Sequence, residues 1–416
     1  MTRTPPAPVG STVLGYPRIG RDRQLKKALE SYWAGRIDGG TLDRDSLSVR
    51  LDALYTMSRA GLDTIPVNTF SWYDQMLDTT VLVGAVPKRF AGVSGDHTLA
   101  GFDASRYFAM ARGTKGVPPL EMTKWFDTNY HYLVPEIGPD TAFALHADKP
   151  LAEFDEAHSR KIASRPVVVG PFTFLALAKA ADGAPEGFDP LSRLGELTEV
   201  YVELLAALAA AGVQWVQIDE PALVRDVSRD EIEAAYATYD RLAQVADRPA
   251  ILLATYFGSP GADVLSALAH TEVEGFALDL LRGPKPGEIE DLEDLFDKSL
   301  VLGAVDGRNI WRTDLRAAAE ELTTWRGISR TVSVSTSCSL LHVPYDVAVE
   351  VDLDPALRSS LAFADQKLAE VVALQQSLDS EGAEFAEAFA ASDAAVAGRS
   401  SIPGLYRGEV AGRVSR

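Results

Sequence analysis

The chain is poor in the residues that build disulfides and metal cages. Its 416 residues include one cysteine, Cys338, and six histidines. A single cysteine cannot form an intramolecular disulfide, and it cannot supply a thiolate cage for zinc. The histidines form no His-x-His, His-x-Cys or His-Glu-x-x-His pattern. The sequence therefore predicts no metal site and no bound cofactor in this chain.

Basic residues are also scarce relative to acidic ones. Lys and Arg number 40 against 59 Asp and Glu, which gives a net charge of −19. Nucleic acids and anionic membrane surfaces attract proteins through clustered Lys and Arg, and they repel a chain of this charge. We therefore expect neither as a main partner. A local basic cluster can still bind an anionic small molecule.

Long apolar runs are missing as well. No stretch of about 18 apolar residues occurs, and the first residues lack the apolar region of a signal peptide. The expected location is the cytoplasm. No G-x-G-x-x-G motif follows an apolar strand, which argues against a dinucleotide-binding fold.

Short apolar runs alternate with helical patterns along most of the chain, as in proteins with a parallel sheet. The number of runs favours a closed (β/α)8 TIM barrel over an open sheet. We expect a flexible N-terminus over 1–11, the barrel over 12–397 with an irregular excursion early in the chain, and a linker or tail over 398–416. The predicted strands cover residues 12–14, 64–67, 142–145, 166–169, 215–218, 250–254, 275–278, 300–305 and 331–334.

Carboxylates follow several of these strands, at the end of a barrel where functional groups collect. Asp219 and Glu220 end one apolar run, and Asp306 ends another. Adjacent residues on a strand point to opposite sides, so Asp219 and Glu220 make a poor general acid–base pair. Each carboxylate either faces a substrate or has a structural role, by capping a helix or pairing with an arginine. The spacing does not decide between these roles.

A basic cluster stands out in the acidic chain. Five cations crowd the start of a predicted helix, and Lys124 adds another cation within an aromatic segment. A helix start favours anions through its free N–H groups and its dipole. The cluster is therefore either a solvated helix face or a site for carboxylates or phosphates. Its members are Arg18, Arg21, Arg23, Lys26 and Lys27.

Several long motifs resemble those of the cobalamin-independent methionine synthase family, in order from about residue 12 to about residue 397. They include LGYPRIG at 14–20, QLKKA at 24–28, DQMLDT at 74–79, EMTKWFDTNYHY at 121–132, VVGPFTF at 168–174 and QIDEPAL at 217–223. The resemblance implies a methyltransferase of methionine biosynthesis that passes a methyl group from 5-methyltetrahydropteroyltri-L-glutamate to L-homocysteine. Members of the family have two (β/α)8 barrels, and this chain is similar to the N-terminal barrel.

The resemblance also implies roles for the basic residues. In the family, an Arg-x-Leu-Lys segment and the lysine of the Met-Thr-Lys-Trp-Phe motif bind the glutamate tail of the folate. The matching positions here are Arg23, Gln24, Leu25, Lys26 and Lys124. The anion-site interpretation of the basic cluster agrees with these roles.

The zinc ligands of the family, a His-x-Cys pair, a glutamate and a distant cysteine, belong to the C-terminal barrel. At the related positions this chain has Thr255-Tyr256-Phe257, Asp279 and Cys338, which do not form a zinc site. We therefore expect a tail-binding and scaffolding half that is inactive without a zinc-bearing C-terminal barrel, supplied in cis or in trans. Two alternatives stay open: a free-standing binder of folate polyglutamates, and a self-sufficient barrel enzyme that uses Asp219, Glu220 and Asp306.

Overall fold

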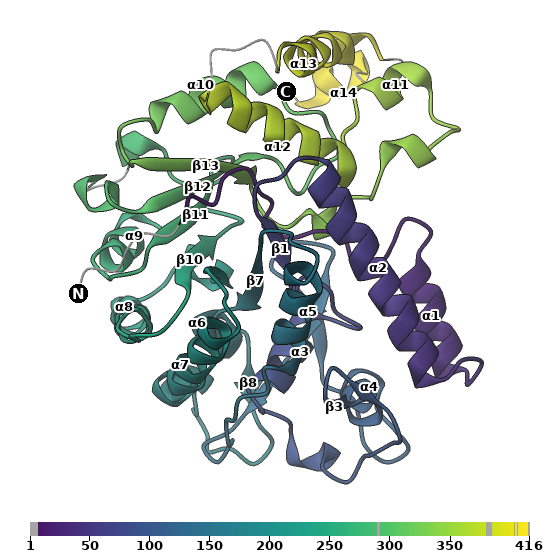
Figure 1. Cartoon of the computed structure of the whole chain (residues 1–416), viewed down its shortest axis with the longest axis vertical. Coiled ribbons are helices and arrows are strands. Elements are labelled where there is room, and N and C mark those ends of the chain that lie inside the picture. The colour runs from purple at the N-terminus through teal and green to yellow at the C-terminus, as the bar shows by residue number, and fades with distance from the viewer. Residues whose placement is uncertain (1–6, 289–291, 380–384, 403, 406, 415–416) are drawn as a thin grey trace.

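The computed structural model describes residues 7–288, 292–379, 385–402, 404–405 and 407–414. Within these residues, seven parallel strands form one sheet in the order β1-β7-β9-β10-β11-β12-β13. This arrangement is that of an α/β barrel, as predicted (Figure 1). The strands are β1 (Ile65–Val67), β7 (Ser164–Val169), β9 (Trp215–Asp219), β10 (Ala250–Thr255), β11 (Gly275–Asp279), β12 (Ser299–Val305) and β13 (Thr331–Thr336).

The segment 11–14 lies between β13 and β1, where an eighth strand would complete the ring. Thr12 N donates to Val334 O at 3.0 Å, and Ser11 O accepts from Asp63 N at 3.0 Å. The predicted strand at 12–14 is nevertheless wrong, because side chains make some of the hydrogen bonds to this segment that the backbone of a neighbouring strand would otherwise make. Arg165 donates to Val13 O, for example, at 2.9 Å.

Residues 7–11, which were expected to be flexible, pack against the barrel. Val9 is fully buried, and the Trp215 indole donates to Ala7 O at 2.9 Å. The rest of the predicted N-terminal region, residues 1–6, lies outside the described residues.

Helices cover the outside of the sheet (Figure 1). Sequence signals explain their boundaries: α8 begins with a Ser228–Glu231 capping box, and Asp74 caps α3. These two caps satisfy N–H groups that the first helical turn leaves free. The helices of the barrel are α2 (Gly39–Arg59), α3 (Gln75–Leu82), α5 (Asp148–His158), α6 (Pro171–Ala176), α7 (Leu194–Ala210), α8 (Arg229–Ala243), α9 (Ala262–Ala269), α10 (Leu315–Thr324) and α12 (Ala364–Asp379).

The predicted excursion leaves the barrel between β1 and β7 and packs around a second apolar cluster that includes Leu25, Phe90 and Phe108. The predicted strand at 142–145 is wrong: Ala144 N bonds to Val83 O at 3.0 Å, at the end of α3. The excursion contains α4 (Ala104–Arg112), the pair β2 (Thr98–Leu99) and β3 (Phe102–Asp103), the hairpin β4 (Met122–Lys124) and β5 (His131–Leu133), and β6 (Glu136–Ile137). Helix α1 (Gln24–Trp33), which precedes β1, packs in the same apolar cluster, and β8 (Lys179–Ala180), which follows β7, pairs with β6.

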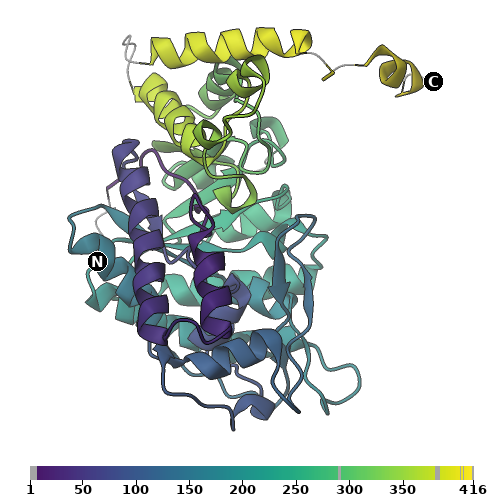
Figure 2. The same ribbon diagram turned by 90° about the vertical axis from the view of Figure 1, so that its right-hand side faces the viewer.

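The C-terminal region is helical. Helix α11 (Pro355–Ser359) follows β13, and α13 (Ala386–Gly398) packs against α10 and α12. Figure 2 shows α14 (Gly408–Val414) beyond the end of α13. In the described part of the chain, no helix combines the length and apolarity needed to cross a bilayer.

Candidate functional site

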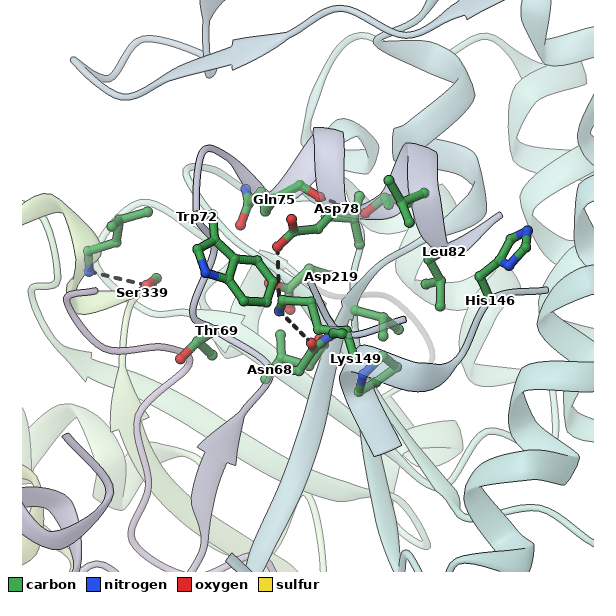
Figure 3. Close-up of a pocket in the computed structure, with 18 of the residues that line it drawn as sticks. Asn68, Thr69, Trp72, Gln75, Asp78, Leu82, His146, Lys149, Asp219 and Ser339 are labelled. Atoms are coloured by element: carbon green, nitrogen blue, oxygen red, sulfur yellow. Dashed lines mark hydrogen bonds and ion pairs between the residues drawn. The ribbon is translucent and has the colours of Figure 1, made fainter. Parts of the chain in front are cut away.

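An open cavity lies at the carboxyl ends of the parallel strands (Figure 3). Asn68 after β1, Asp219 of β9, Tyr256 after β10 and Ser339 after β13 are among its lining residues. It occupies about 1070 Å³, including the space that opens to solvent. Barrel proteins bind small molecules at this end of the strands, so the cavity and its surroundings form the candidate site.

Asp219 ends β9 and lies deep in the cavity wall. Its Oδ1 accepts from Gln217 Nε2 at 2.7 Å, and its Oδ2 accepts from the Tyr256 hydroxyl at 3.0 Å. Gln217 in turn accepts two hydrogen bonds from the buried guanidinium of Arg165, at 3.1 and 2.7 Å. Burial raises the pKa of Asp219 to about 7 and lowers that of Arg165 to about 9. Through Gln217, Asp219 balances the charge of Arg165 inside the barrel.

Glu220 points the other way and caps a helix. Its carboxylate accepts from Phe172 N at 3.1 Å and Thr173 N at 2.6 Å, at the start of α6, and from the Tyr239 hydroxyl at 2.6 Å. A Cβ on Gly170 would lie 2.1 Å from Glu220 Oε1, so glycine is needed for this approach. Burial raises the pKa of Glu220 to about 7. The structural interpretation holds for this residue.

Asp306 is also engaged within the fold. One carboxylate oxygen lies 3.0 Å from Arg282 Nη2 and accepts from Asn309 Nδ2 at 2.8 Å. The other accepts from Arg308 N at 2.8 Å. These bonds shape the loop after β12. Of the three strand-end carboxylates, Asp219 alone lines the cavity.

A lysine that the sequence analysis did not single out lies within the cavity wall. Lys149 Nζ donates to Asn68 Oδ1 at 2.8 Å and to Phe70 O at 2.6 Å. It also lies 3.0 Å from Glu153 Oε1 and 3.4 Å from Asp78 Oδ2. These acceptors occupy the ammonium group and fix the loop after β1 (Figure 3). The spacing of Lys149 and Glu153, one helical turn apart, was the available sequence signal.

The five residues expected to bind the glutamate tail separate into two groups. Arg23, Lys26 and Lys124 are exposed, and among the described residues none pairs with Arg23 or Lys124. Lys26 lies 3.7 Å from Glu30. Leu25 is 1% exposed and packs in the second apolar cluster, and the Gln24 side chain accepts from Asp22 N at 3.0 Å. Leu25 and Gln24 thus shape the start of α1, and the three cations remain accessible.

Arg18 links the start of α1 to the hairpin that carries Lys124. Its guanidinium donates to Ser71 O at 2.7 Å and to Tyr73 O. It also lies 5.8 Å from the centre of the Tyr130 ring, in the turn of the β4–β5 hairpin. Arg18 therefore contacts both the loop after β1 and the hairpin that carries Lys124.

Cys338 and Asp279, two of the positions that the resemblance relates to zinc ligands, are buried and engaged within the fold. Burial raises the pKa of the Cys338 thiol, and nearby Asp279 adds to this effect, whereas zinc binds a thiolate. Asp279 accepts backbone hydrogen bonds from Leu281, at 2.9 Å, and Phe257, at 3.3 Å. Among the described residues, no group of three His, Cys, Asp or Glu side chains has the arrangement of a metal site.

Comparisons with known proteins agree with the motifs. The pattern of the family described as "Cobalamin-independent synthase, N-terminal domain" matches residues 10–330. The 5-methyltetrahydropteroyltriglutamate–homocysteine methyltransferase of Mycobacterium tuberculosis H37Rv is 53% identical over 407 residues, which make up 98% of this chain and 52% of that protein. The protein of the same name from Rhodococcus jostii RHA1 is 52% identical over 405 residues, covering 97% of this chain and 52% of its own length.

A B12-independent methionine synthase structure from Shewanella sp. W3-18-1 shares the fold, with a TM-score of 0.60 at 14% identity over 90% of this chain and 98% of that one. The chain spans about half the length of the curated relatives it matches. With a family pattern over 10–330 and relatives more than half identical, the chain belongs to the family of cobalamin-independent synthase N-terminal domains.

Proposed function

We propose that this chain is the half of a cobalamin-independent methionine synthase that binds the glutamate tail of 5-methyltetrahydropteroyltriglutamate and supports a C-terminal barrel. The observation that carries the proposal is the match at 53% identity to 98% of this chain but 52% of a named methyltransferase. Homocysteine and zinc would be bound by the C-terminal barrel, present in cis or in trans.

The exposed cations support the tail-binding role. A glutamate tail carries several carboxylates, which Arg and Lys bind through charge-assisted hydrogen bonds. Arg23 and Lys26 lie at the start of α1, where the helix dipole also favours anions. In a chain of net charge −19, such a site has to be built from local cations.

The buried carboxylates support the need for a second barrel. Glu220 and Asp306 are committed to a helix cap and to an ion pair, and Asp219 balances Arg165 through Gln217. The alternative of a self-sufficient enzyme would use one of these three groups to take or give a proton. The three residues instead stabilise the barrel.

The test is methionine formation from homocysteine and 5-methyltetrahydropteroyltriglutamate with added zinc. The chain is assayed alone, a separate C-terminal half is assayed alone, and the two are then mixed. We expect turnover only in the mixture. Turnover by the chain alone would overturn the proposal in favour of a self-sufficient enzyme. Tight folate binding without turnover in any arm would overturn it in favour of a free-standing binder.

A further inference from the structure

Strand β4 of the β4–β5 hairpin is exposed, whereas Tyr132 and Leu133 of β5 are buried. All three residues of β4 are exposed, and Met122 has 48% of its surface accessible. The strands pair over only three residues each, from Met122–Leu133 to Lys124–His131. A two-stranded hairpin of this length is marginal in water. The position of Lys124 therefore depends on contacts that other parts of the chain make with the hairpin.

One such contact is an ion pair across the barrel mouth. Arg308, in the loop after β12, places Nη1 2.9 Å from Asp127 Oδ1 in the hairpin turn. The Arg308 side chain is 17% exposed and that of Asp127 is 75% exposed. The arginine is therefore packed against the barrel, and its ion pair connects the exposed turn to the barrel. Arg308 N also bonds to Asp306, which fixes the loop that carries it. The hydrogen bond between the Arg308 and Asp127 side chains lowers the pKa of Asp127.

Aromatic contacts reinforce the same junction. The Arg308 guanidinium lies 5.0 Å from the centre of the Phe257 ring, and Phe257 lies 5.5 Å from Phe126 of the hairpin turn. His342 contacts Phe257 at 5.5 Å and Tyr130 at 6.4 Å between ring centres. The junction thus joins the hairpin turn to the loops after β10, β12 and β13.

The backbone at this junction is strained on both sides. Phe126 has φ of 51° and Phe257 has φ of 78°, in the left-handed region that bulky residues rarely adopt. Such conformations persist only where surrounding contacts compensate for their cost. The two strained residues are the pair of rings that meet at 5.5 Å. The turn therefore depends on the barrel for its shape.

The turn adjoins Lys124 through Trp125, whose side chain is buried. Trp125 N donates to Tyr130 O at 2.8 Å, and Lys124 is the next residue towards the N-terminus. Arg308 itself is a poor carboxylate ligand, because Asp127 and the Phe257 ring occupy its guanidinium. Asp127 would also repel an anion placed next to that pair.

We propose that Arg308 and Asp127 are positioning residues, whose ion pair across the barrel mouth fixes the β4–β5 hairpin and thereby places the Lys124 ammonium for the glutamate tail of the folate. The inference rests on the proposed function for its ligand. Its structural half, the anchoring of the hairpin, can be measured without any ligand.

The first readout is hydrogen exchange in the unliganded 416-residue chain. Arg308→Ala is expected to speed exchange at the amides of Trp125 and Thr128, which close the hairpin turn, and to leave β9 and β10 unchanged. Arg316→Ala is the matched control, because it removes an exposed ion pair with Asp393 far along the chain. Equal exchange in Arg308→Ala and wild type would overturn the anchoring.

The second readout is calorimetric binding of the triglutamyl and monoglutamyl forms of 5-methyltetrahydrofolate. Arg308→Ala is expected to weaken triglutamyl binding about three- to tenfold and monoglutamyl binding hardly at all. In the Lys124→Ala background, Arg308→Ala should weaken triglutamyl binding no further, because the cation that Arg308 positions is gone. Additive losses in the double variant would overturn the positioning role.

Asp127→Asn separates positioning from direct binding. If Arg308 bound the tail itself, freeing it from Asp127 would strengthen triglutamyl binding. The proposal predicts the opposite sign, a weakening similar to that of Arg308→Ala. A wild-type chain with no preference for the triglutamyl form would refute the proposed function and with it the role in tail placement. Faster exchange in Arg308→Ala would then still establish the anchor.

Discussion

The barrel interior and the α1–hairpin edge use charge in opposite ways. Inside the barrel, Arg165, Asp219 and Glu220 are buried, and each is hydrogen-bonded to partners in the fold. At the edge, Arg23 and Lys124 are exposed and unpaired among the described residues. A buried charge must be satisfied internally because desolvation is costly, whereas an exposed cation remains available for a ligand.

The difference separates two kinds of conspicuous residue. The spacing of the strand-end carboxylates leaves a substrate-facing or a structural role open, and in the structure Glu220 and Asp306 hold a helix and a loop in place. The basic cluster is either a solvated helix face or an anion site in sequence, and the structure leaves its members Arg23 and Lys26 exposed at the start of α1. Stability and binding should therefore respond separately to substitutions in the two regions.

Glu220→Ala should have the largest effect on stability. It leaves two backbone N–H groups of α6 and the Tyr239 hydroxyl without their acceptor in a dry site. We expect a loss of about 3 kcal/mol or more in the free energy of unfolding, measured by urea denaturation. The matched control is Glu199→Ala, which removes an exposed pair with Arg241 and should cost less than about 1 kcal/mol. Equal losses for the two variants would contradict the distinction between the regions.

The buried carboxyls should also make stability depend on pH. Burial raises the pKa values of Asp74, Asp219 and Glu220 to about 7 in the folded chain, against about 4 when unfolded. The folded state then binds more protons in this window. Their stabilising contribution is complete below about pH 4 and is lost as the pH rises to about 7.

Asp219→Asn removes one of these titrating groups. From pH 4.5 to 7.5 the wild type should lose stability relative to this variant, as followed by urea unfolding at each pH. A difference between the two proteins that stays constant over this range would show that Asp219 does not titrate as its burial predicts.

Substitutions at the exposed edge should change binding and leave stability unchanged. Lys124→Ala or Lys26→Ala should weaken binding of the triglutamyl folate roughly fivefold, with a smaller loss for the monoglutamyl form. The loss should be greater at low salt, because exposed charges are then less screened. Lys27→Ala, with the same change of charge on the neighbouring position of α1, is the control in calorimetric titrations. Equal weakening of both folates by Lys124→Ala would argue against a tail site.

The sequence predicted the barrel strands well because buried parallel strands are continuous apolar runs, as in Ile251–Leu253 of β10. It failed at 12–14 and 142–145, where long-range contacts decide the backbone pairing. The sequence left the role of Glu220 open between capping a helix and facing a substrate, since its partners Thr173 and Tyr239 are 47 and 19 residues away. The same holds for Arg308, whose partner Asp127 is 181 residues distant along the chain.

Added zinc should have the smallest effect on stability. It tests whether the buried groups of the barrel interior are available to a ligand. A metal stabilises a protein only by binding its native state more tightly than its unfolded state. The one thiol, Cys338, is fully buried with a raised pKa, and the Asp279 carboxylate already accepts backbone hydrogen bonds. The melting temperature of the chain should therefore stay nearly constant with stoichiometric zinc, as measured by calorimetry against a chelator control. A saturable rise that Cys338→Ser abolishes would mean that the barrel interior can rearrange to offer a metal ligand. The buried charged groups would then not be fixed by their internal hydrogen bonds, and the contrast with the exposed edge would fail.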